Sequence, residues 1–534
     1  MPEQKMPKDS SAAQPAPENQ SSPAVNVFAV HGVEPEVQAY AMAKYSRSAL
    51  SMKESLKEIS EQKAEQFLNT FYFQYGHRSI ADLAHIAFAI ERLSILAAIE
   101  LVDEQRWDGQ ERSTRYQNFK KSGYYTAEFG ADEAARQLYR ETADFLFAEY
   151  TAISDEVFFA LVARTPRPPE MEQAAYDRTL KARAFDVSRY LLPLATNTSL
   201  GQIVNARTLE TQISRLLSHT HGEIRQLGEL LREAARTPAY NVNHETWKKL
   251  IAEIRAVNEG LAQRAEGELL KPVKVAPTLV KYTNPQQYEI ETRKEMAQAA
   301  AELMRDKGGS PPAIEKAPMV DLLDDEPLEV ELATTLLYGA CHYPYRQIRE
   351  QVMGHPAEFW REIITLGTRH RGKHDELLRP FSAGQAFRFD ILMDIGGFRD
   401  MHRHRRCVQI EQGFTTEHGF DLPPDIVSSG LQPRYGAAMK RAAETVAKLS
   451  ARQAPEAAES AQYLIPLGYR KRTLFKMDLA EALYIAELRT TPAGHWSYRE
   501  VAYAMYEQVA KRYPSLGKLF RVHDVREPVD LLRR

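Results

Sequence analysis

Two short runs of residues have side chains suited to binding an anion. The run Arg403–Arg406 reads RHRR at the end of an apolar segment, and the tetrapeptide Ser113–Tyr116 reads STRY. Arginine is suited to phosphate because its planar guanidinium offers a fork of N–H donors and stays charged when partly buried. Neighbouring cations repel one another unless an anion lies among them. The pyrophosphate of a cofactor, a nucleotide phosphate or nearby carboxylates would each meet that need, and a solvated basic surface or an ion-pair network is the alternative.

The histidine and cysteine positions do not point to a metal site. His402 and His404 alternate along a helical pattern, so their side chains face different sides, and the adjacent arginines would repel a cation. His219 and His221 lie on another helical pattern and are expected to pack or to face solvent. Cys407 beside the arginines is a candidate for a lowered thiol pKa, but a lone cysteine is more often a small buried side chain. We expect no metal ion.

Size and composition exclude several classes of protein. A chain of 534 residues exceeds what one hydrophobic core supports, so at least two domains are expected. The net charge of -3 gives no general attraction to nucleic acid or to an anionic membrane. The two cysteines cannot form a disulfide framework, and the most apolar long segment, Leu83–Val102, contains charged residues. We therefore expect a cytoplasmic protein with no membrane span and no nucleic-acid partner.

Composition also divides the chain. Residues 1–25 are rich in Pro, Ser, Gln and Ala and predict a disordered tail. Residues 26–267 and 326–534 read as two mostly helical blocks, and the Pro- and Gly-rich residues 268–325 as a linker with a helix near Glu289–Arg305. In the first block the hydrophobic patterns predict helices over Ala64–Gln74, Ile80–Val102, Ala134–Ala163, Tyr176–Leu191 and Gln202–Ala235.

The two blocks repeat the same order of features, which predicts an internal duplication. Each has an apolar helical segment that runs into a polar stretch, Phe88–Gln105 in the first and Phe389–Arg405 in the second. Each then has a tripeptide, Leu191–Pro193 (LLP) or Leu464–Pro466 (LIP), followed by a long amphipathic helix that carries arginine.

In this order the motifs resemble those of the flavin-dependent thymidylate synthase family. That family reads Y-G-H-x-[ST], F-x-I-x-G-x-S, R-H-R, then S-x-R-Y, R-x-x-L-P, N-A-R-S-L and E-I-R. The first half carries YGHRS, FAIERLS, STRY, RYLLP, NARTL and EIR between residues 75 and 225. Its R-H-R, however, falls on Asp103, Glu104 and Gln105. The second half has R-H-R at 403–405 and Glu411 at the family's acidic position, but GFTT at 413–416 in place of S-x-R-Y, with Gln462 and Asp478 replacing an Arg and an Asn.

The resemblance implies an α+β, helix-rich fold with two tandem repeats of the family domain. It implies a reaction as well: the family methylates dUMP to dTMP with methylenetetrahydrofolate, with FAD as cofactor and NADPH as hydride source. Family members are homotetramers whose sites combine several subunits. A tandem chain is therefore expected to act as a pseudo-dimer and to form a homo-oligomer with a second chain.

Carried over by position, the resemblance gives the motif residues their roles. The residues expected to bind flavin are His77, Ser79, Asn205, Arg207, Arg403, His404 and Arg405. Those expected to bind the nucleotide are Glu111, Ser113, Arg115, Arg189 and Arg489, among which Ser113, Arg115 and Arg189 are expected to be catalytic. Arg215 lies one residue out of register with an arginine of the family.

Neither half holds the full set of motifs, so a complete site requires elements of both halves to meet. One interpretation is a fused dimer that keeps one composite site and has lost the other. The alternatives are a degenerate flavin- or nucleotide-binding paralogue without synthase activity, or a different flavin enzyme. Departures from the family pattern that bear on this choice are Asp108, Val408, Leu378 and Pro380.

Overall fold

The computed structural model describes residues 32–44, 78–305, 310–372, 375, 377–454 and 456–532. The predicted tail, the helix predicted over Ala64–Gln74 and the residue His77 lie outside these ranges, as does the side chain of Ser79. In the described ranges no helix is long and apolar enough to cross a membrane.

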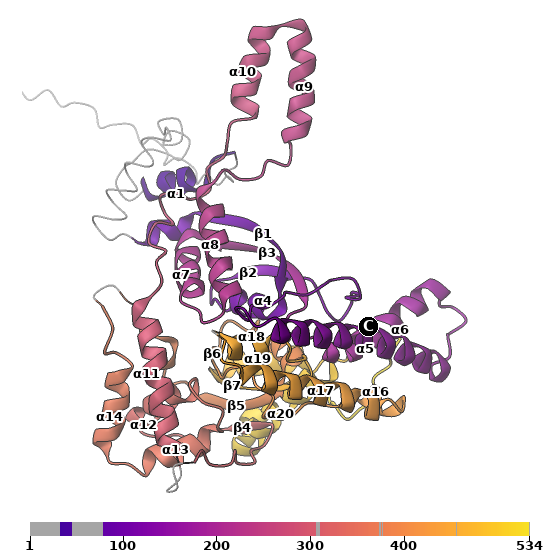
Figure 1. Cartoon of the computed structure of the whole chain (residues 1–534), viewed down its shortest axis with the longest axis vertical. Helices are drawn as coiled ribbons and strands as arrows, with labels where there is room; N and C mark the ends of the chain where they lie inside the picture. The colour runs from indigo at the N-terminus through magenta and orange to yellow at the C-terminus, as the bar shows by residue number, and fades with distance from the viewer. Residues whose placement is uncertain are drawn as a thin grey trace, which may run out of the picture.

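The first half of the chain is built on a three-stranded antiparallel sheet with the strand order β1-β3-β2 (Figure 1). The strands are β1 (His85–Ser94), β2 (Asp108–Glu111) and β3 (Asn197–Asn205). The helices of this half are α1 (Pro35–Lys44), η2 (Arg78–Leu83), α4 (Ile95–Val102), α5 (Glu133–Arg164), α6 (Gln173–Ser188), η3 (Arg189–Leu191), α7 (Ala206–Leu217) and α8 (Gly222–Arg236).

The second half is built on a four-stranded antiparallel sheet with the order β4-β5-β7-β6. Its strands are β4 (Val320–Leu322), β5 (Phe387–Asp394), β6 (Val408–Glu411) and β7 (Arg470–Met477). Its helices are α12 (Leu328–Tyr338), α13 (Tyr345–Met353), α14 (Ala357–Leu366), η4 (Arg379–Phe381), α15 (Ile395–Met401), α16 (Pro424–Ser428), α17 (Gln432–Ser450), α18 (Ala457–Gln462), α19 (Leu479–Arg489), α20 (Trp496–Arg512) and α21 (Pro514–Gly517).

Both halves follow one topology, so the predicted α+β fold with two tandem repeats is confirmed. In each half a strand leads into a short helix, then an edge strand, a long helix, the central strand and two more helices. The short helix is capped in the same way in both copies. The Ser94 hydroxyl accepts from the Ala97 N–H and donates to Glu223 on α8, whereas the Asp394 carboxylate accepts from the Gly397 N–H and from the Ser497 hydroxyl on α20. The cap is thus a hydroxyl paired with a carboxylate in the first copy and a carboxylate paired with a hydroxyl in the second.

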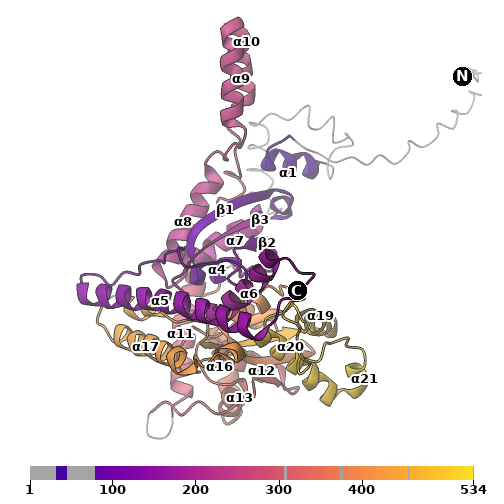
Figure 2. The same ribbon diagram turned by 90° about the vertical axis from the view of Figure 1, so that its right-hand side faces the viewer.

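The LLP and LIP tripeptides mark a local two-fold axis between the copies. Pro193 and Pro466 pair as an antiparallel β-bridge. The Leu194 N–H donates to the Ile465 carbonyl (2.9 Å), and the equivalent Leu467 N–H donates to the Leu192 carbonyl (3.0 Å). The two hydrogen bonds are therefore counterparts of each other across the axis. Such reciprocal contacts are characteristic of an isologous interface. The long helices α5 and α17 lie side by side across the same interface (Figure 2).

Three of the predicted helices are wrong in part, because a strand occupies some of their residues. Strand β1 lies within Ile80–Val102, β5 covers the start of Phe389–Arg405, and β3 covers the start of Gln202–Ala235. The prediction over Ala134–Ala163 is confirmed by α5. Strand β5 is buried at nearly every position. A strand covered on both faces lacks the alternation that identifies a strand in sequence and reads as a continuous apolar run.

The segment between the copies holds three helices, α9 (His244–Val257), α10 (Glu259–Leu269) and α11 (Gln287–Leu303). Helices α9 and α10 form a hairpin that projects from the rest of the chain (Figures 1 and 2). The chain then returns to the first copy, where the Ala239 N–H donates to the Val273 carbonyl and Ala276, Leu279 and Val280 are buried. Helix α11 packs against α12 and α14 of the second copy.

One hydrophobic core runs through both copies, and a second lies under the second sheet. The larger core joins β1, α4 and α5 to β5, α15 and α20. The smaller core packs α11–α14 against Ile410 and Leu474, on the other face of the second sheet. The second sheet is therefore covered on both faces, which explains why its strands carry no alternating pattern.

Candidate functional site

Elements from both copies converge at the interface next to the tripeptides. The second copy contributes the end of α15 and the loop that follows it, and the first copy contributes the turn after β2 and the junction between α6 and η3. Helix α15 comes close to Arg189 because Gly396 has no side chain. A Cβ at Gly396 would lie 3.2 Å from the Tyr190 ring and 3.5 Å from the Arg189 guanidinium carbon.

Thr114 is the contact point between the two copies' arginines. Its hydroxyl accepts from Arg189 Nη1 (3.3 Å) of the first copy and from Arg399 Nη1 (3.2 Å) of the second. Arg399 also pairs with Glu111. Both guanidinium groups are nearly buried, so the STRY turn of one copy and the arginine-rich helix end of the other form a single cluster.

Asp186 is the buried counter-ion of this cluster. Its Oδ1 lies 3.1 Å from Arg115 Nε, 3.5 Å from Arg189 Nε and 2.9 Å from His495 Nδ1. Burial by itself raises the pKa of a carboxyl group, but His495 and the two arginines hold the pKa of Asp186 well below its usual value. Burial lowers the pKa of His495 to about 4, so its imidazole is neutral near pH 7.

Arg115 reaches into the second copy. Its Nη1 donates to the Tyr498 hydroxyl (3.1 Å) and its Nη2 to the Ala493 carbonyl (3.0 Å), both near the turn between α19 and α20. Burial would lower the pKa of Arg115, but Asp186 more than offsets it and the pKa is raised. The predicted nucleotide-binding arginine of the first copy is thus fixed by backbone and side chain of the second.

Asp400 and His404 hold the second copy's arginines. Arg489 donates from Nη2 to the Asp400 carbonyl (2.7 Å) and from Nε to His404 Nε2 (2.8 Å). Because Nε2 accepts, His404 carries its proton on Nδ1, which lies 3.4 Å from Glu481. Burial lowers the pKa of His404, in agreement with a neutral ring. The Asp400 carboxylate faces Arg403 and lies 3.9 Å from Arg189.

The cluster carries excess positive charge. Its five arginines, Arg115, Arg189, Arg399, Arg403 and Arg489, outnumber the carboxylates that face them, Glu111, Asp186 and Asp400. Glu481 adds a fourth carboxylate behind the neutral His404 ring, so an excess of one positive charge remains in this group of residues. Among the described residues, Arg189 Nε and Nη2 and Arg399 Nε are buried without a hydrogen-bond partner. Arg399, Arg403 and Glu111 line a pocket with about 300 Å³ of empty space, counting the solvent at its mouth.

Of the other predicted flavin-binding residues, Arg405, Asn205 and Arg207 lie near one end of the first sheet, whereas His77 lies outside the described residues. Arg405 donates to Asp108 (3.1 Å) and stacks over Trp107, and Asp108 pairs with Ile203 across the sheet, two residues before Asn205. The Asn205 side chain caps α7 by accepting from the Thr208 N–H, and Arg207 lies 3.4 Å from Asp82. Ser79 belongs to η2, which packs against α7.

On the other side of the two-fold axis the equivalent positions make ion pairs with one another. Arg215 donates from Nη2 to the Glu100 carbonyl (2.9 Å) and from Nε to Glu104 (3.0 Å). These contacts match those of Arg489 with the Asp400 carbonyl and His404. Arg215 therefore takes the place of Arg489 in spite of its shifted register, and Glu104 takes the place of His404.

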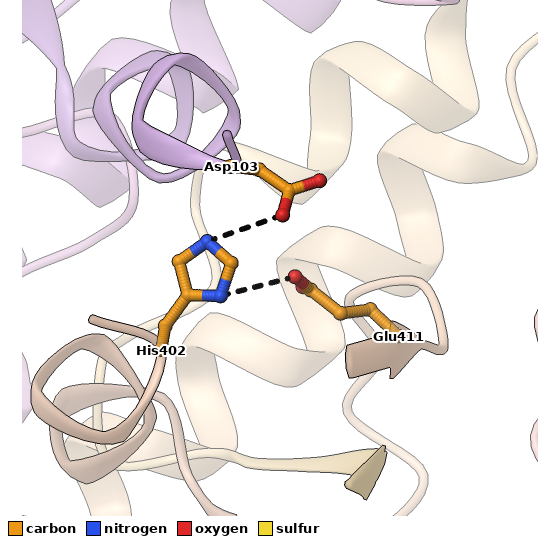
Figure 3. Close-up of side chains that lie close together, drawn as sticks. All are labelled: Asp103, His402 and Glu411. Atoms are coloured by element: carbon orange, nitrogen blue, oxygen red, sulfur yellow. Dashed lines mark ion pairs between the residues drawn. The ribbon is translucent and has the colours of Figure 1, made fainter. Parts of the chain in front are cut away.

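Asp103, His402 and Glu411 meet on this second side (Figure 3). His402 Nε2 lies 3.8 Å from Asp103 Oδ1, and Nδ1 lies 3.4 Å from Glu411 Oε1. The spacing could accommodate a metal ion. Each carboxylate already has a cation, however, because Arg379 lies 2.6 Å from Asp103 and Lys471 lies 2.7 Å from Glu411. Both carboxylates are therefore compensated without a metal ion, and the group forms an ion-pair network.

The lone cysteine near the arginines is not activated. Cys407 is buried, and burial raises the pKa of its thiol to about 12, the opposite of the lowered pKa that a nucleophile needs. His219 and His221 lie in the turn between α7 and α8 rather than on a helix, and burial lowers the pKa of both.

The structure brings together the predicted residues Glu111, Ser113, Arg115 and Arg189 with Arg403, His404 and Arg489. Ser113 is placed through its hydroxyl, which accepts from the Arg115 N–H (3.3 Å). Sequence reasoning missed the roles of Asp186, His495, Arg399 and Asp400. One signal for His495 was available: it precedes α20 as His221 precedes α8, so an alignment of the two copies would have drawn attention to it.

The two copies form a duplicated α+β domain pair that shares one interface cluster. The family model for thymidylate synthase complementing protein matches residues 30–239 and 327–515, which is most of the chain. The chain therefore belongs to the thymidylate synthase complementing protein family, with one family domain in each half.

Relatives of two kinds are found. A UPF0159 protein of Chlamydia pneumoniae is 27% identical over 95% of this chain and 93% of its own length. A flavin-dependent thymidylate synthase of Clostridium tetani is 26% identical over 38% of this chain and 78% of its own. Among solved structures, thymidylate synthase X of Helicobacter pylori with FAD and dUMP is 16% identical, covering 38% of this chain and 88% of that one with a TM-score of 0.26.

Proposed function

We propose that this protein is a flavin-dependent methyltransferase that converts dUMP to dTMP at one composite site per chain. Membership of the family and the flavin-dependent relative support this class of reaction. The observation that carries the proposal is the buried arginine cluster, whose arginines outnumber its carboxylates and which holds buried N–H groups without acceptors. A nucleotide monophosphate is an anion near pH 7 and offers several oxygen acceptors, so it would meet both needs of the cluster.

The nucleotide phosphate would meet Arg189, Arg399 and the STRY turn. Arg189 Nε and Nη2 and Arg399 Nε are the buried N–H groups that need acceptors, and an anion of this kind offers several oxygens at once. Arg115 and Arg489 would complete the set. Arg115 is held by Tyr498 and the Ala493 carbonyl of the other copy, and Arg489 by the Asp400 carbonyl of its own copy. A neutral ligand would leave the charge of the cluster uncompensated.

FAD would bind beside the nucleotide, along the loop that carries Arg403 and Arg405. Their side chains are 40% and 30% exposed, so their guanidinium groups are accessible to a pyrophosphate. Asn205 and Arg207, at the same end of the first sheet, would extend this site, with His77, Ser79 and His404 as the remaining candidates. When bound, FAD supplies the redox chemistry and the transfer of the one-carbon unit from methylenetetrahydrofolate, with NADPH as reductant.

A second candidate is a binding protein that has lost the reaction. The observation in its favour is that Arg399, Arg403 and Arg405 each already pair with a carboxylate, namely Glu111, Asp400 and Asp108. Ligand binding would have to compete with these pairs. This candidate predicts FAD or nucleotide binding without turnover.

The proposal is tested by the visible spectrum of the purified protein, with and without added FAD, followed by NADPH oxidation and dTMP formation with dUMP. Flavin absorbance together with dTMP supports the synthase, and flavin absorbance without dTMP supports the second candidate. A protein that binds no flavin would refute the synthase, and one that binds neither flavin nor nucleotide would refute both candidates.

A pair of arginine variants tests the nucleotide site. Arg189→Gln removes a buried charged donor and should weaken dUMP binding by roughly 10- to 100-fold, as expected for charge-assisted hydrogen bonds. Arg183→Gln is the matched control, because Arg183 lies on α6, six residues before Arg189, but pairs with Asp425. Equal loss of dUMP affinity in both variants would contradict the assignment. Isothermal titration calorimetry measures both.

A further inference from the structure

The loop His402–Cys407 holds the arginines proposed to bind flavin, and its conformation depends on one buried ring. The His402 N–H donates to the Phe398 carbonyl (2.7 Å) at the end of α15. Gln409 accepts from His402 Nδ1 (2.9 Å) and donates to the carbonyls of His402 (3.3 Å) and His404 (3.1 Å). The backbone on both sides of Arg403 is therefore fixed through His402 and Gln409.

We infer that Asp103, His402 and Glu411 form a positioning clamp that orients this loop for flavin, and that the two-fold-related site, where the clamp lies, binds no second ligand. The inference rests on the proposed function. The His402 side chain is only 3% exposed, and the two carboxylates lie against its two ring nitrogens from different copies (Figure 3). The clamp thus ties the loop of the second copy to the first.

The clamp occupies the positions that a second site would need. Asp103 and Arg403 follow the equivalent helices α4 and α15 at the same distance from their caps, Ser94 and Asp394, and Glu411 is the counterpart of Glu111. Where the composite site has Arg403 and His404, this side has Asp103 and Glu104. The pocket here, of about 270 Å³ including solvent at its mouth, is lined by those two carboxylates and by Arg379 and Arg405. Its acidic and basic side chains balance, and Arg379 is already paired with Asp103, so this side offers no excess positive charge to a second anion. One flavin per chain is therefore expected.

Each carboxylate of the clamp has a cation of its own, which limits its pull on the arginines of the loop. Arg379 compensates Asp103, and Lys471 compensates Glu411. Asp103 and Glu411 can therefore hold the loop without drawing Arg403 or Arg405 away from a ligand. Burial would raise the pKa of Asp103, but Arg379 and His402 hold it well below its usual value, so the carboxylate stays charged across the neutral range.

The test measures FAD stoichiometry, FAD affinity by flavin fluorescence, and dUMP affinity in the full-length protein. The unaltered chain should bind one FAD. Asp103→Asn should weaken FAD by roughly 10- to 100-fold, the size of effect that misplacement of a binding group produces. It should leave dUMP affinity within about twofold, because Arg115 and Arg189 are unchanged. Asp103→Glu should restore FAD binding, because it restores the negative charge. A loss that was merely structural would lower both affinities.

Two further variants keep the test decisive. His402→Asn keeps a polar group near the Nδ1 position but loses the contact with Asp103, and it leaves Arg379 paired, so it should fold and weaken FAD as Asp103→Asn does. Asp321→Asn is the matched control. Asp321 lies on β4, the edge of the second sheet opposite to the β6 edge that carries Glu411, and it pairs with Arg346 (2.7 Å). It should bind FAD normally.

The results that would overturn the inference differ from those that would overturn the function. Two FAD per chain, equal FAD affinity in Asp103→Asn and Asp321→Asn, or a stoichiometric divalent metal lost in His402→Asn would each refute the clamp while leaving the synthase intact. An unaltered protein that binds no FAD would refute the proposed function and this inference with it.

Discussion

Arg92 has a positive φ of 63°, in a β-bulge of β1 where the pairing with β3 shifts by one residue. The left-handed region costs a residue with a Cβ about 1–2 kcal/mol, whereas glycine enters it freely. The family pattern F-x-I-x-G-x-S has glycine at this position, whereas here an arginine adopts the left-handed conformation. The equivalent strand β5 pairs without a shift and has one residue fewer between its phenylalanine and its helix cap.

Arg92→Gly should therefore stabilise the protein. The relief of strain exceeds the added flexibility of the unfolded chain, and we expect a gain of about 0.5–1 kcal/mol in the free energy of unfolding. Arg92→Ala is the control, because it removes the exposed side chain but keeps the strain. Urea unfolding distinguishes the two, and an equal effect of both changes would contradict the explanation.

Asp394 couples stability to pH. Burial and the nearby Asp421 raise its pKa to about 7, above its unfolded value of about 3.9. Between about pH 4 and 7 the folded state therefore keeps a proton that the unfolded state has released. The free energy of unfolding falls as the pH rises through that range, by roughly 1–3 kcal/mol. Asp394→Asn keeps a good helix cap and should flatten this fall. Urea unfolding at several pH values measures it, and an unchanged slope would exclude Asp394 as its source.

At the scale of residues the sequence predicted the arginines of the interface cluster better than the groups that hold them. Ser113, Arg115, Arg189, Arg403 and Arg489 were found because their spacing matches motifs. Asp186 was missed because a buried counter-ion belongs to no motif of its own. Its role is visible only in the folded chain, where α6 places it beside Arg115, which comes from another part of the sequence.

At the scale of elements, the helices were predictable and most strands were not. The amphipathic pattern of α5 marked its ends to within a residue or so. Strands β5 and β7 are enclosed by two cores, and their sequences carry no alternation for that reason. Strand β3 alternates, but it passes directly into α7 at Asn205, so the predicted helix ran back across the boundary.

The hairpin of α9 and α10 should be dispensable for folding. Its helices pack on each other, and the chain closes beneath them where Pro238 bridges Lys274 and Ala239 bonds to Val273. Replacing residues 242–271 with a short Gly/Ser turn should change the free energy of unfolding by less than about 1 kcal/mol, since the ends already meet. Thermal unfolding and FAD binding measure this, and loss of either would show that the hairpin contributes to the body of the protein.

At the scale of the whole molecule, the larger core crosses from one copy to the other. The two family domains should therefore unfold as one unit in spite of the length of the chain. We expect a single calorimetric transition, with near- and far-ultraviolet circular dichroism giving the same midpoint. Two resolved transitions would indicate that each copy is stable without its partner. We also propose, from the resemblance to tetrameric relatives, that two chains associate.

The bridge between Pro193 and Pro466 has an evolutionary consequence. In a symmetric dimer of identical chains one codon sets the residue on both sides of the axis, so a change of Arg to Asp would remove both sites in a single step. Once the two copies share one reading frame, each side has its own codon. Asp103 could then arise by mutation while Arg403 was retained, and a lineage could pass through that change without losing its remaining site.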